Sequence, residues 1–169
     1  MKKVVFITAP VAFRDEEYYK PKDIFENACV EVITASVKIG ELIGRFGYKT
    51  ISTILIQNIN IDNFNAIVYI GGNGANIFFN NHYALKLAND FFKHDKVIAS
   101  ICIASVVLAN SGILNGKRAT VFSDGKEILI KKGALYTGNR LEIDKNIITA
   151  NGPEVAEDFG KAILSAISD

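Results

Sequence analysis

Residues 97–105 read Val-Ile-Ala-Ser-Ile-Cys-Ile-Ala-Ser, and this segment is the most informative part of the sequence. Its first five residues form a short run of the kind that fills a buried strand, and a helical pattern follows. Cys102 stands at the junction, with the small residues Ser100 and Ala104 two positions before and after it. This spacing is that of a nucleophile elbow, a tight strand-to-helix turn that needs small neighbours. The segment therefore predicts an α/β fold with a cysteine at a strand end.

Short β-branched runs on both sides of this segment predict further strands, separated by stretches with helical spacing. The predicted strands cover residues 4–7, 30–35, 66–70, 97–101, 119–122, 141–143 and 146–150. The predicted helices cover residues 21–28, with Ile24, Phe25 and Ala28 on one face, then 83–92, 103–111, 124–132 and the segment from Pro153 onward. Residues 42–56 alternate around glycines and predict a small hairpin excursion. Together these elements predict a flavodoxin-like, doubly wound α/β fold: a mostly parallel sheet with helices on both faces.

The overall composition excludes several classes of protein. With 169 residues and 49% hydrophobic content, the sequence predicts one folded domain over residues 1–169. A net charge of +1 argues against nucleic-acid binding. The longest apolar run, Val97 to Ala109, is too short to span a membrane, and the first residues do not resemble a signal peptide, so a cytoplasmic location is expected. Two Cys and two His leave too few ligands for a zinc site or a disulfide framework.

The elbow cysteine has two interpretations. Ligands of doubly wound sheets bind beyond the carboxyl ends of the strands, where we expect the loops that begin at Thr8, Gly71, Cys102 and Asn151. A thiol there, at the first turn of a helix, feels the positive end of the helix dipole, which would lower its pKa and make it reactive. The alternative is a buried small hydrophobe, as most free cysteines are. Cys29, between a predicted helix and a strand, is expected to be such a core residue.

Two further segments have a functional and a purely structural interpretation. Gly71-Gly72-Asn73-Gly74 follows a buried strand and would let backbone amides approach an oxyanion, or it is a plain turn. It lacks the spacing of a dinucleotide or phosphate-binding loop. Arg14-Asp15-Glu16-Glu17 is either an exposed acidic turn or supplies one inward carboxyl group beside the thiol. His82, in a polar turn, and His94, at a helix end, are both expected to lie on the surface.

Several segments of the sequence together resemble a known family. The matching pieces are residues 12–17 with Pro21, then residues 66–72, 98–104, 108–120 and 148–153. They make the chain similar to the ThiJ/PfpI family of the class I glutamine amidotransferase-like superfamily, which includes a Parkinson-disease-associated deglycase and archaeal intracellular proteases. The elbow with its Leu-Ala…Gly-x-Leu-x-Gly-Lys-x-Ala-Thr continuation is the most specific piece, and the resemblance covers essentially the whole chain.

The resemblance implies a role for several residues. Cys102 would be the reactive, oxidation-prone thiol, and Glu17, aligned by its spacing to Pro21, the inward acid beside it. Backbone amides at Gly72 and in the Cys102–Ile103 turn would bind an oxyanion. The family implies no metal or organic cofactor, and it implies a homodimer or higher homo-oligomer acting on a small-molecule substrate.

The sequence departs from the family where histidines would stand. Protease-like members carry His directly after the cysteine, where this chain has Ile103. Glyoxalase- or deglycase-like members often supply His just beyond the Ala-Thr strand, where this chain reads Val121-Phe122-Ser123-Asp124 and has no histidine. General base work would then fall to Glu17, a water, or Asp124. Asn151 takes the place of an arginine found in some members before the Gly-Pro pair, which removes one anion-binding charge from the pocket.

Three functions follow from these observations. The first is a cysteine-dependent enzyme that acts on small carbonyl or glycated compounds, in the manner of a glyoxalase or deglycase, through Cys102 and Glu17. The second is a redox-responsive or chaperone-like stress protein without turnover, in which Cys102 oxidises beside a protonated Glu17. The third is an intracellular cysteine peptidase, which the missing Cys–His pair disfavours most.

Overall fold

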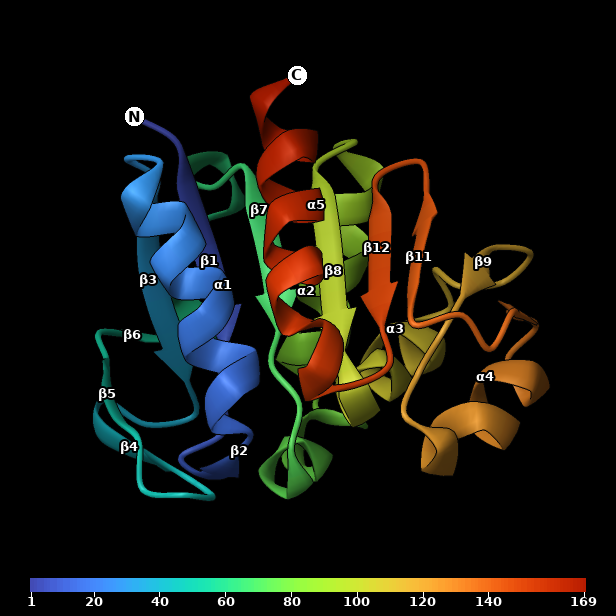
Figure 1. Ribbon diagram of the computed structural model, residues 1–169, viewed down its shortest axis with the longest axis horizontal. Coiled ribbons are helices and arrows are strands. Elements are labelled where there is room, and N and C mark those ends of the chain that lie inside the picture. The colour runs from blue at the N-terminus through green and yellow to red at the C-terminus, as the bar shows by residue number, and fades with distance from the viewer.

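A seven-stranded sheet forms the centre of the molecule, as the computed structural model of residues 1–169 shows (Figure 1). In spatial order its strands are β11 (Leu141–Asp144), β12 (Ile147–Ala150), β8 (Val97–Ile101), β7 (Ala66–Tyr69), β1 (Lys3–Ile7), β3 (Glu31–Ser36) and β6 (Ile54–Leu55). All neighbours pair in parallel except β11, which is antiparallel to β12. The order β3-β1-β7-β8-β12 is the 2-1-3-4-5 order of flavodoxin-like sheets. The predicted fold class is therefore confirmed.

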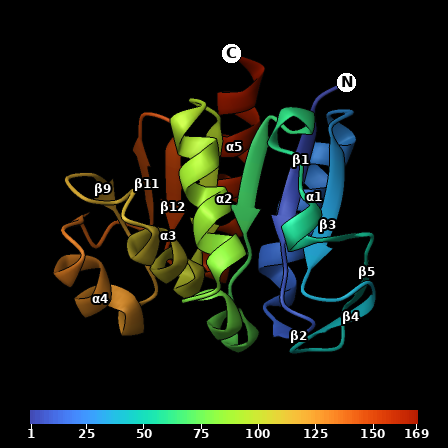
Figure 2. The same cartoon turned by 180° about the vertical axis from the view of Figure 1, so that it is seen from behind.

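Helices cover both faces of this sheet (Figures 1 and 2). Helices α1 (Asp15–Asn27) and α5 (Ala156–Ser168) lie on one face, and α2 (His82–Lys93) and α3 (Ser105–Ser111) lie on the other. The short helix α4 (Lys126–Lys131) lies outside the β11 edge, next to a two-stranded sheet of β9 (Arg118–Ala119) and β10 (Leu135–Tyr136). The predicted strand over 119–122 is thus shorter and begins earlier. None of the helices is long and apolar enough to cross a bilayer.

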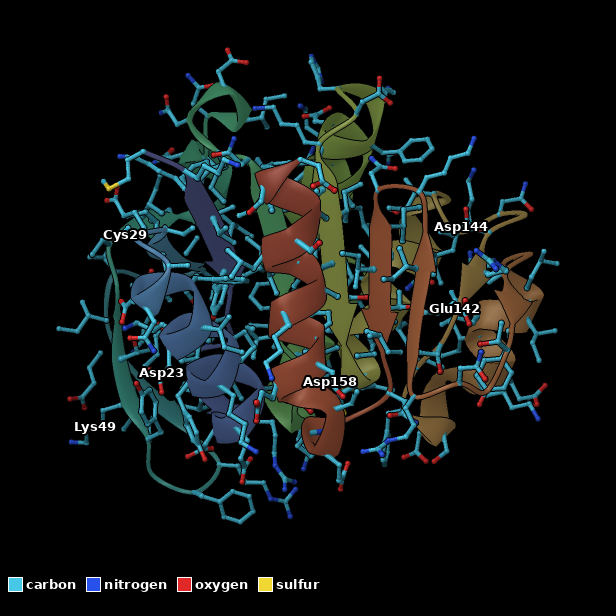
Figure 3. The ribbon with its side chains drawn as sticks, turned by 45° about the horizontal axis from the view of Figure 1, so that its top comes forward. Asp23, Cys29, Lys49, Glu142, Asp144 and Asp158 are labelled. Carbon is cyan, nitrogen blue, oxygen red and sulfur yellow. The ribbon has the colours of Figure 1, made fainter.

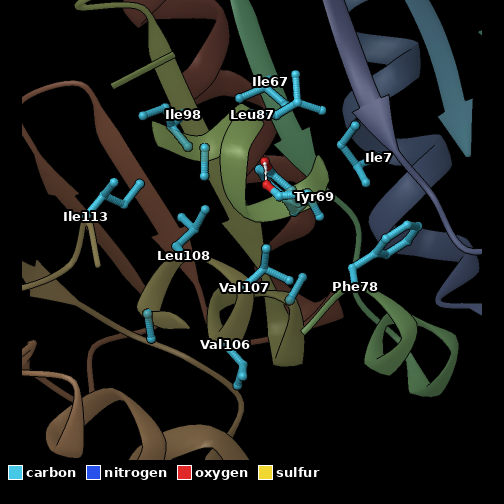
Figure 4. Close-up of a cluster of buried hydrophobic side chains, with 14 of the residues drawn as sticks. Ile7, Ile67, Tyr69, Phe78, Leu87, Ile98, Val106, Val107, Leu108 and Ile113 are labelled. Carbon is cyan, nitrogen blue, oxygen red and sulfur yellow. Dashed lines mark hydrogen bonds between the residues drawn. The ribbon is translucent and has the colours of Figure 1, made fainter. Parts of the chain in front are cut away.

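The strands of the central sheet are buried on both sides, which explains their continuous apolar sequences. In β1, Val4 and Phe6 point into the core beneath α1 and α5, whereas Val5 and Ile7 point into the core beneath α2 and α3. Figure 4 shows part of the second core, where Tyr69 donates a hydrogen bond of 2.8 Å to the carbonyl oxygen of Ala84. The apolar layers on both faces hold the strand ends in fixed positions.

Helix α1 begins six residues before the predicted start, at Asp15 instead of Pro21. Proline favours the first turn of a helix, which is why the sequence suggested a start there. Asp15 and Glu16 lie in the real first turn, where the helix dipole favours acidic side chains, and Pro21 lies inside the helix. Pro21 packs against α5 at Gly160, where an added Cβ would lie 3.0 Å from the Pro21 Cα and from Ile24 Cδ1. The two helices therefore approach so closely here that any larger residue at position 160 would force its neighbours to shift.

The hairpin excursion forms a small three-stranded sheet of β2 (Val11–Phe13), β4 (Gly40–Gly44) and β5 (Lys49–Ser52). Strands β4 and β5 are antiparallel, as predicted, and β4 pairs in parallel with β2. Asp15 fixes the turn of this hairpin, because its buried carboxylate accepts hydrogen bonds from the amides of Phe46 (3.0 Å) and Tyr48 (2.9 Å). The hairpin turn is thereby tied to the start of α1.

Two residues placed in the core by the sequence are exposed. Cys29 adopts a left-handed backbone conformation (φ 58°) in the turn between α1 and β3, and its side chain lies at the surface (Figure 3). Ala28, which caps α1, is also exposed. The prediction was wrong because the helix ends one residue earlier and the chain turns there, so these residues no longer follow the helical pattern.

Candidate active site

A cavity of about 440 Å³ lies at the carboxyl ends of the central strands. Three short 3-10 segments follow these strands and contribute to its walls: η3 (Asn73–Phe78), η4 (Cys102–Ala104) and η6 (Pro153–Val155). A fourth, η5 (Ser123–Gly125), reaches the cavity after β9. The full lining is Arg14, Glu17, Arg45, Gly72, Asn73, Asn76, Phe79, Cys102, Ile103, Phe122, Asp124, Asn151, Gly152, Pro153 and Glu154. All six residues proposed from the sequence for this site lie in the lining: Cys102, Glu17, Gly72, Ile103, Asp124 and Asn151.

Cys102 occupies a strained turn between β8 and η4. Its φ is 61°, a left-handed conformation that costs a non-glycine residue about 1–3 kcal/mol. Strand β8 ends at Ile101, so the chain reverses direction at the cysteine as the elbow pattern predicts. The side chain is half-buried and lines the cavity. Strain of this kind is retained where the surrounding structure holds the residue in place, here directly after a fully buried strand.

Glu17 reaches the cysteine from the first turn of α1. Its side chain is completely buried, and neither carboxyl oxygen has a hydrogen-bond partner of good geometry. Gly71 makes this approach possible, because an added Cβ there would collide with Glu17 Oε2 and lie 2.6 Å from the Cys102 Cβ. The earlier start of α1 places Glu17 within a rigid helix, and the acid, the glycine and the cysteine are packed against one another.

Burial dominates the protonation of Glu17. Removal from water raises the pKa of its carboxyl group from 4.5 to about 8, and the nearby Cys102 thiol, Arg14 and the Gly71 amide offset this only in part. The carboxyl group therefore holds its proton at neutral pH. A protonated carboxyl can donate a hydrogen bond to a neighbouring anion, which an ionised one cannot.

The pKa of the Cys102 thiol is also raised, to about 12. Burial is the largest cause and the negative charge of Glu17 the next, while the amides of Ile103 and Gly72 lower the pKa in part. The expected lowering by a helix dipole is wrong here, because only the three-residue turn η4 follows the cysteine directly and burial outweighs its field. The two amides nevertheless provide donors beside the sulfur.

The glycine loop after β7 is locked against the β2–α1 corner. Gly72 has a φ of 98°, and an added Cβ would collide with the backbone around Phe13 and Arg14. The Arg14 amide donates a 3.0 Å hydrogen bond to the carbonyl oxygen of Gly71. This close approach is the backbone geometry that the glycine-rich sequence suggested, and it brings the Gly72 amide near the Cys102 sulfur.

Several lining residues were not predicted. Arg45, Asn76, Phe79 and Glu154 reach the cavity from the hairpin turn, η3 and η6. Glu154 follows Gly152-Pro153 at a predicted strand end, so its position could have been found from the sequence. Arg45 could not, because only the pairing of β4 with β2 brings the hairpin turn to the cavity.

Both histidines lie outside the lining of the cavity. His82 is the first residue of α2, and His94 caps the other end of this helix, with Nδ1 2.8 Å from the carbonyl oxygen of Asp90. No cluster of three or more His, Cys, Asp or Glu side chains has a geometry suited to a metal ion. Acid–base groups within the cavity are therefore Glu17, Asp124 and Glu154, together with the thiol.

Comparison with known proteins identifies the family. The sequence pattern of the DJ-1/PfpI family matches residues 2–166. A protein of Methanocaldococcus jannaschii described as uncharacterized is 39% identical over 168 residues, covering 98% of this chain and 82% of that protein. A Pyrococcus abyssi protein named as a deglycase is 29% identical over 149 residues, covering 88% of this chain and 90% of that protein. The solved structure of a ThiJ/PfpI domain protein from Brachyspira murdochii is 28% identical, with a TM-score of 0.96 over 98% of this chain and 96% of that one. The elbow, the packed glycine loop and these matches together show that the chain belongs to the DJ-1/PfpI family.

Proposed function

We propose that the protein is a cysteine-dependent enzyme that acts on small carbonyl or glycated compounds, with Cys102 as the nucleophile and Glu17 as the proton carrier. The observation that carries the proposal is the buried Glu17 carboxyl group, which lacks a good hydrogen-bond partner, packs against Cys102 and has a pKa of about 8. An acid with a strongly shifted pKa that lies in a cavity next to a thiol is the arrangement expected of a catalytic pair. The name of the Pyrococcus abyssi relative, a deglycase, agrees with this class of substrate.

The position of the proton explains how the pair becomes reactive. Glu17 and Cys102 titrate as a pair. When this pair loses its first proton, the negative charge can reside on the Glu17 carboxyl group or on the Cys102 sulfur. The amides of Gly72 and Ile103 favour the anion on sulfur, while the Gly71 amide favours it on Glu17. The Glu17 side chain is completely buried and that of Cys102 only half-buried, so burial disfavours the charge on Glu17. A protonated Glu17 also removes the repulsion that raises the pKa of Cys102. The reactive form we propose is the thiolate beside a carboxylic acid. With pKa values of about 8 for Glu17 and about 12 for Cys102, it is the minor form of the singly ionised pair, and the apparent titration belongs to the pair.

The first chemical step is addition to a carbonyl group. The thiolate donates an electron pair to the carbonyl carbon to form the S–C bond, the C=O π electrons move to oxygen, and the Glu17 proton passes to that oxygen. The product is a hemithioacetal, and Glu17 is left as a carboxylate. With an α-oxoaldehyde, this carboxylate can then take the proton from the carbon that carries sulfur. Returning the proton to the neighbouring carbon, while the hydroxyl proton moves to the neighbouring oxygen, gives a 2-hydroxy thioester. Water then attacks the thioester carbon, the S–C bond breaks, and the thiolate leaves with release of a 2-hydroxy acid, without an external oxidant.

The test is turnover of methylglyoxal by purified protein. We expect activity in the wild type and in Cys29→Ser, and only background activity in Cys102→Ala. Glu17→Gln keeps the size of the side chain but cannot carry the proton, so we expect a loss of at least 100-fold, in the range of a lost general acid–base group, or about 10²–10⁴. Equal background rates in the wild type and Cys102→Ala would refute the proposal.

A second candidate is oxidation of Cys102 without turnover. Two molecules of peroxide each transfer one oxygen atom to the thiolate and leave as water, which converts it to a sulfinate. The protonated Glu17 can donate a hydrogen bond to the new oxygens. Mass spectrometry after mild peroxide should show two added oxygen atoms on Cys102 with the exposed Cys29 as internal comparison, and an unmodified Cys102 would exclude this function.

Peptide hydrolysis remains the least favoured function, because no imidazole lines the cavity beside Cys102. Casein hydrolysis that copurifies with the protein and disappears in Cys102→Ser would support peptidase activity.

We further propose that residues 1–169 form one domain and that the chain assembles as a homodimer or higher homo-oligomer in the cytoplasm. Light scattering of the purified protein tests the assembly.

A further inference from the structure

Two arginines line one side of the cavity and share a single aromatic ring. The guanidinium carbon of Arg14 lies 4.9 Å from the centre of the Phe46 ring, and that of Arg45 lies 5.7 Å from it. Contacts of this kind are cation–π interactions, which orient the charged groups. Phe46 is 64% exposed, so it does not serve as a core residue. Its ring instead contacts and orients the two guanidinium groups.

The donors of these arginines are largely free. Arg14 uses Nε to bind Glu16 Oε2 at 2.7 Å, and its two terminal nitrogens make no hydrogen bond within the chain. The side chain of Arg45 makes no hydrogen bond or ion pair within the chain. A guanidinium group offers planar, paired donors that match carboxylate and phosphate oxygens. The charge of Arg14 also acts on Glu17 and Cys102, so this side of the cavity is electrostatically coupled to the proposed nucleophile.

The hairpin turn that carries Arg45 and Phe46 is held rigidly. Buried Asp15 accepts from the Phe46 and Tyr48 amides, and the Arg45 amide donates a 2.8 Å hydrogen bond to the carbonyl oxygen of Phe13. An added Cβ at Gly44 would lie 2.5 Å from Asp15 Oδ1, which shows how tightly the carboxylate fits under the turn. A binding group that is fixed before the ligand arrives loses less entropy on binding.

The charged residues of the cavity are distributed unevenly, with the arginines on one side. Arg14 and Arg45 come from the β2–α1 connection and the β4–β5 turn, whereas Asp124 comes from η5; Glu154 comes from η6, at the start of α5. Figure 1 shows the β4–β5 turn and α4, which follows η5, on opposite sides of the central strands. An anionic group on a ligand is therefore attracted to the arginines and repelled by Asp124.

We propose that Arg14 and Arg45 bind an anionic group of the substrate, so that the enzyme favours carbonyl compounds that carry a carboxylate or a similar anion. This inference rests on the proposed function for its substrate, but the anion site itself can be tested without turnover. Arg45 is the specificity-determining residue, because its side chain makes no hydrogen bond or ion pair within the chain and only its contact with the Phe46 ring orients it.

The first experiment measures how the cavity discriminates by charge. In a Cys29→Ser background only Cys102 remains to be alkylated, and the rate with iodoacetate, an anion, is divided by the rate with neutral iodoacetamide. We expect Arg45→Gln to lower this ratio about fivefold, as for the loss of one nearby charge. The control is Lys49→Gln, which removes the same charge from the same hairpin. Lys49 is 63% exposed and lies outside the cavity lining (Figure 3), so we expect the ratio to stay within about twofold.

An unchanged ratio in Arg45→Gln, or an equal fall in Lys49→Gln, would overturn the inference. A second readout is protection of Cys102 from iodoacetamide by glyoxylate, with neutral glyoxal for comparison. We expect Arg45→Gln to weaken protection by glyoxylate about fivefold and leave protection by glyoxal unchanged. If the wild type turns over no carbonyl compound but the alkylation ratio still depends on Arg45, the proposed function fails and the anion site stands.

Discussion

Replacing Glu17 by glutamine is expected to remove a large pH dependence from the stability of the protein. The pKa of this carboxyl group is about 8 in the folded protein, against 4.5 for an ordinary glutamate. Between these values the unfolded chain has lost the proton while the folded chain keeps it, so the unfolded state is favoured increasingly as pH rises. Stability contributed by the protonated acid is fully present below pH 4.5 and is lost up to about pH 8.

The size of the effect follows from the pKa difference. One pKa unit corresponds to about 1.4 kcal/mol, so the shift from 4.5 to about 8 amounts to about 5 kcal/mol in the free energy of unfolding. Other titrating groups are common to both proteins and cancel when the wild type is compared with Glu17→Gln at each pH.

Urea denaturation at several pH values provides the measurement. The wild type should lose stability relative to Glu17→Gln by about 1.4 kcal/mol per pH unit across this window, and the difference should level off above it. Glu26→Gln, which removes an exposed carboxylate from the same helix and its pair with Lys22, is the control; we expect a change below about 1 kcal/mol. A constant difference between the wild type and Glu17→Gln at all pH values would refute the assignment of a buried, protonated acid.

Three further substitutions test the packing. Gly71→Ala places a methyl group against Glu17 and Cys102, so we expect a loss of about 1–3 kcal/mol in urea denaturation and slower alkylation of the thiol; wild-type values for both would contradict the packed arrangement. Tyr18→Phe removes a buried hydroxyl that bridges two threonines at 2.6 Å each, and should lower the free energy of unfolding by about 1–3 kcal/mol, whereas no loss would show that these bonds are not formed. Phe159→Ala empties a fully buried site beneath α5 and should cost about 3–5 kcal/mol without changing the pH dependence; a loss below 1 kcal/mol would argue against this core.

The sequence predicted well those elements whose pattern reflects local burial. The runs around Val4, Ala66 and Val97 are continuous and apolar because both faces of a parallel sheet are covered, and all three are strands close to the predicted bounds. The elbow at Cys102 was also predictable, since a strand, a tight turn and small neighbours leave a local signature. The start of α1 was not, because Pro21 is tolerated inside that helix.

Features that depend on distant segments could not be predicted. The direction of the Cys102 pKa shift follows from burial and from a carboxyl group on another element, while the local sequence indicated only a helix end. Arg45 joins the cavity through the pairing of β4 with β2, a contact with no signal in the hairpin sequence. The exposure of Cys29 follows from a left-handed turn, which the apolar sequence on its C-terminal side does not reveal.

The close contact at Gly160 gives a remote residue control over the distance between acid and sulfur. Helix α5 contributes no atom to the cavity lining, yet its contact with Pro21 limits how far α1 can sit from the sheet, and Glu17 is one helical turn away from Pro21 on α1. The distance between α1 and α5 at this contact thus helps to set the position of Glu17, the proton-carrying residue. A methyl group at this position would lie 3.0 Å from Pro21 Cα, so α1 would have to shift by a few tenths of an ångström. Because burial is the main cause of the raised pKa of Glu17, a shift of α1 that changes this burial would change the pKa. A residue outside the cavity could therefore alter the pH dependence of the site while every residue of the cavity stays the same.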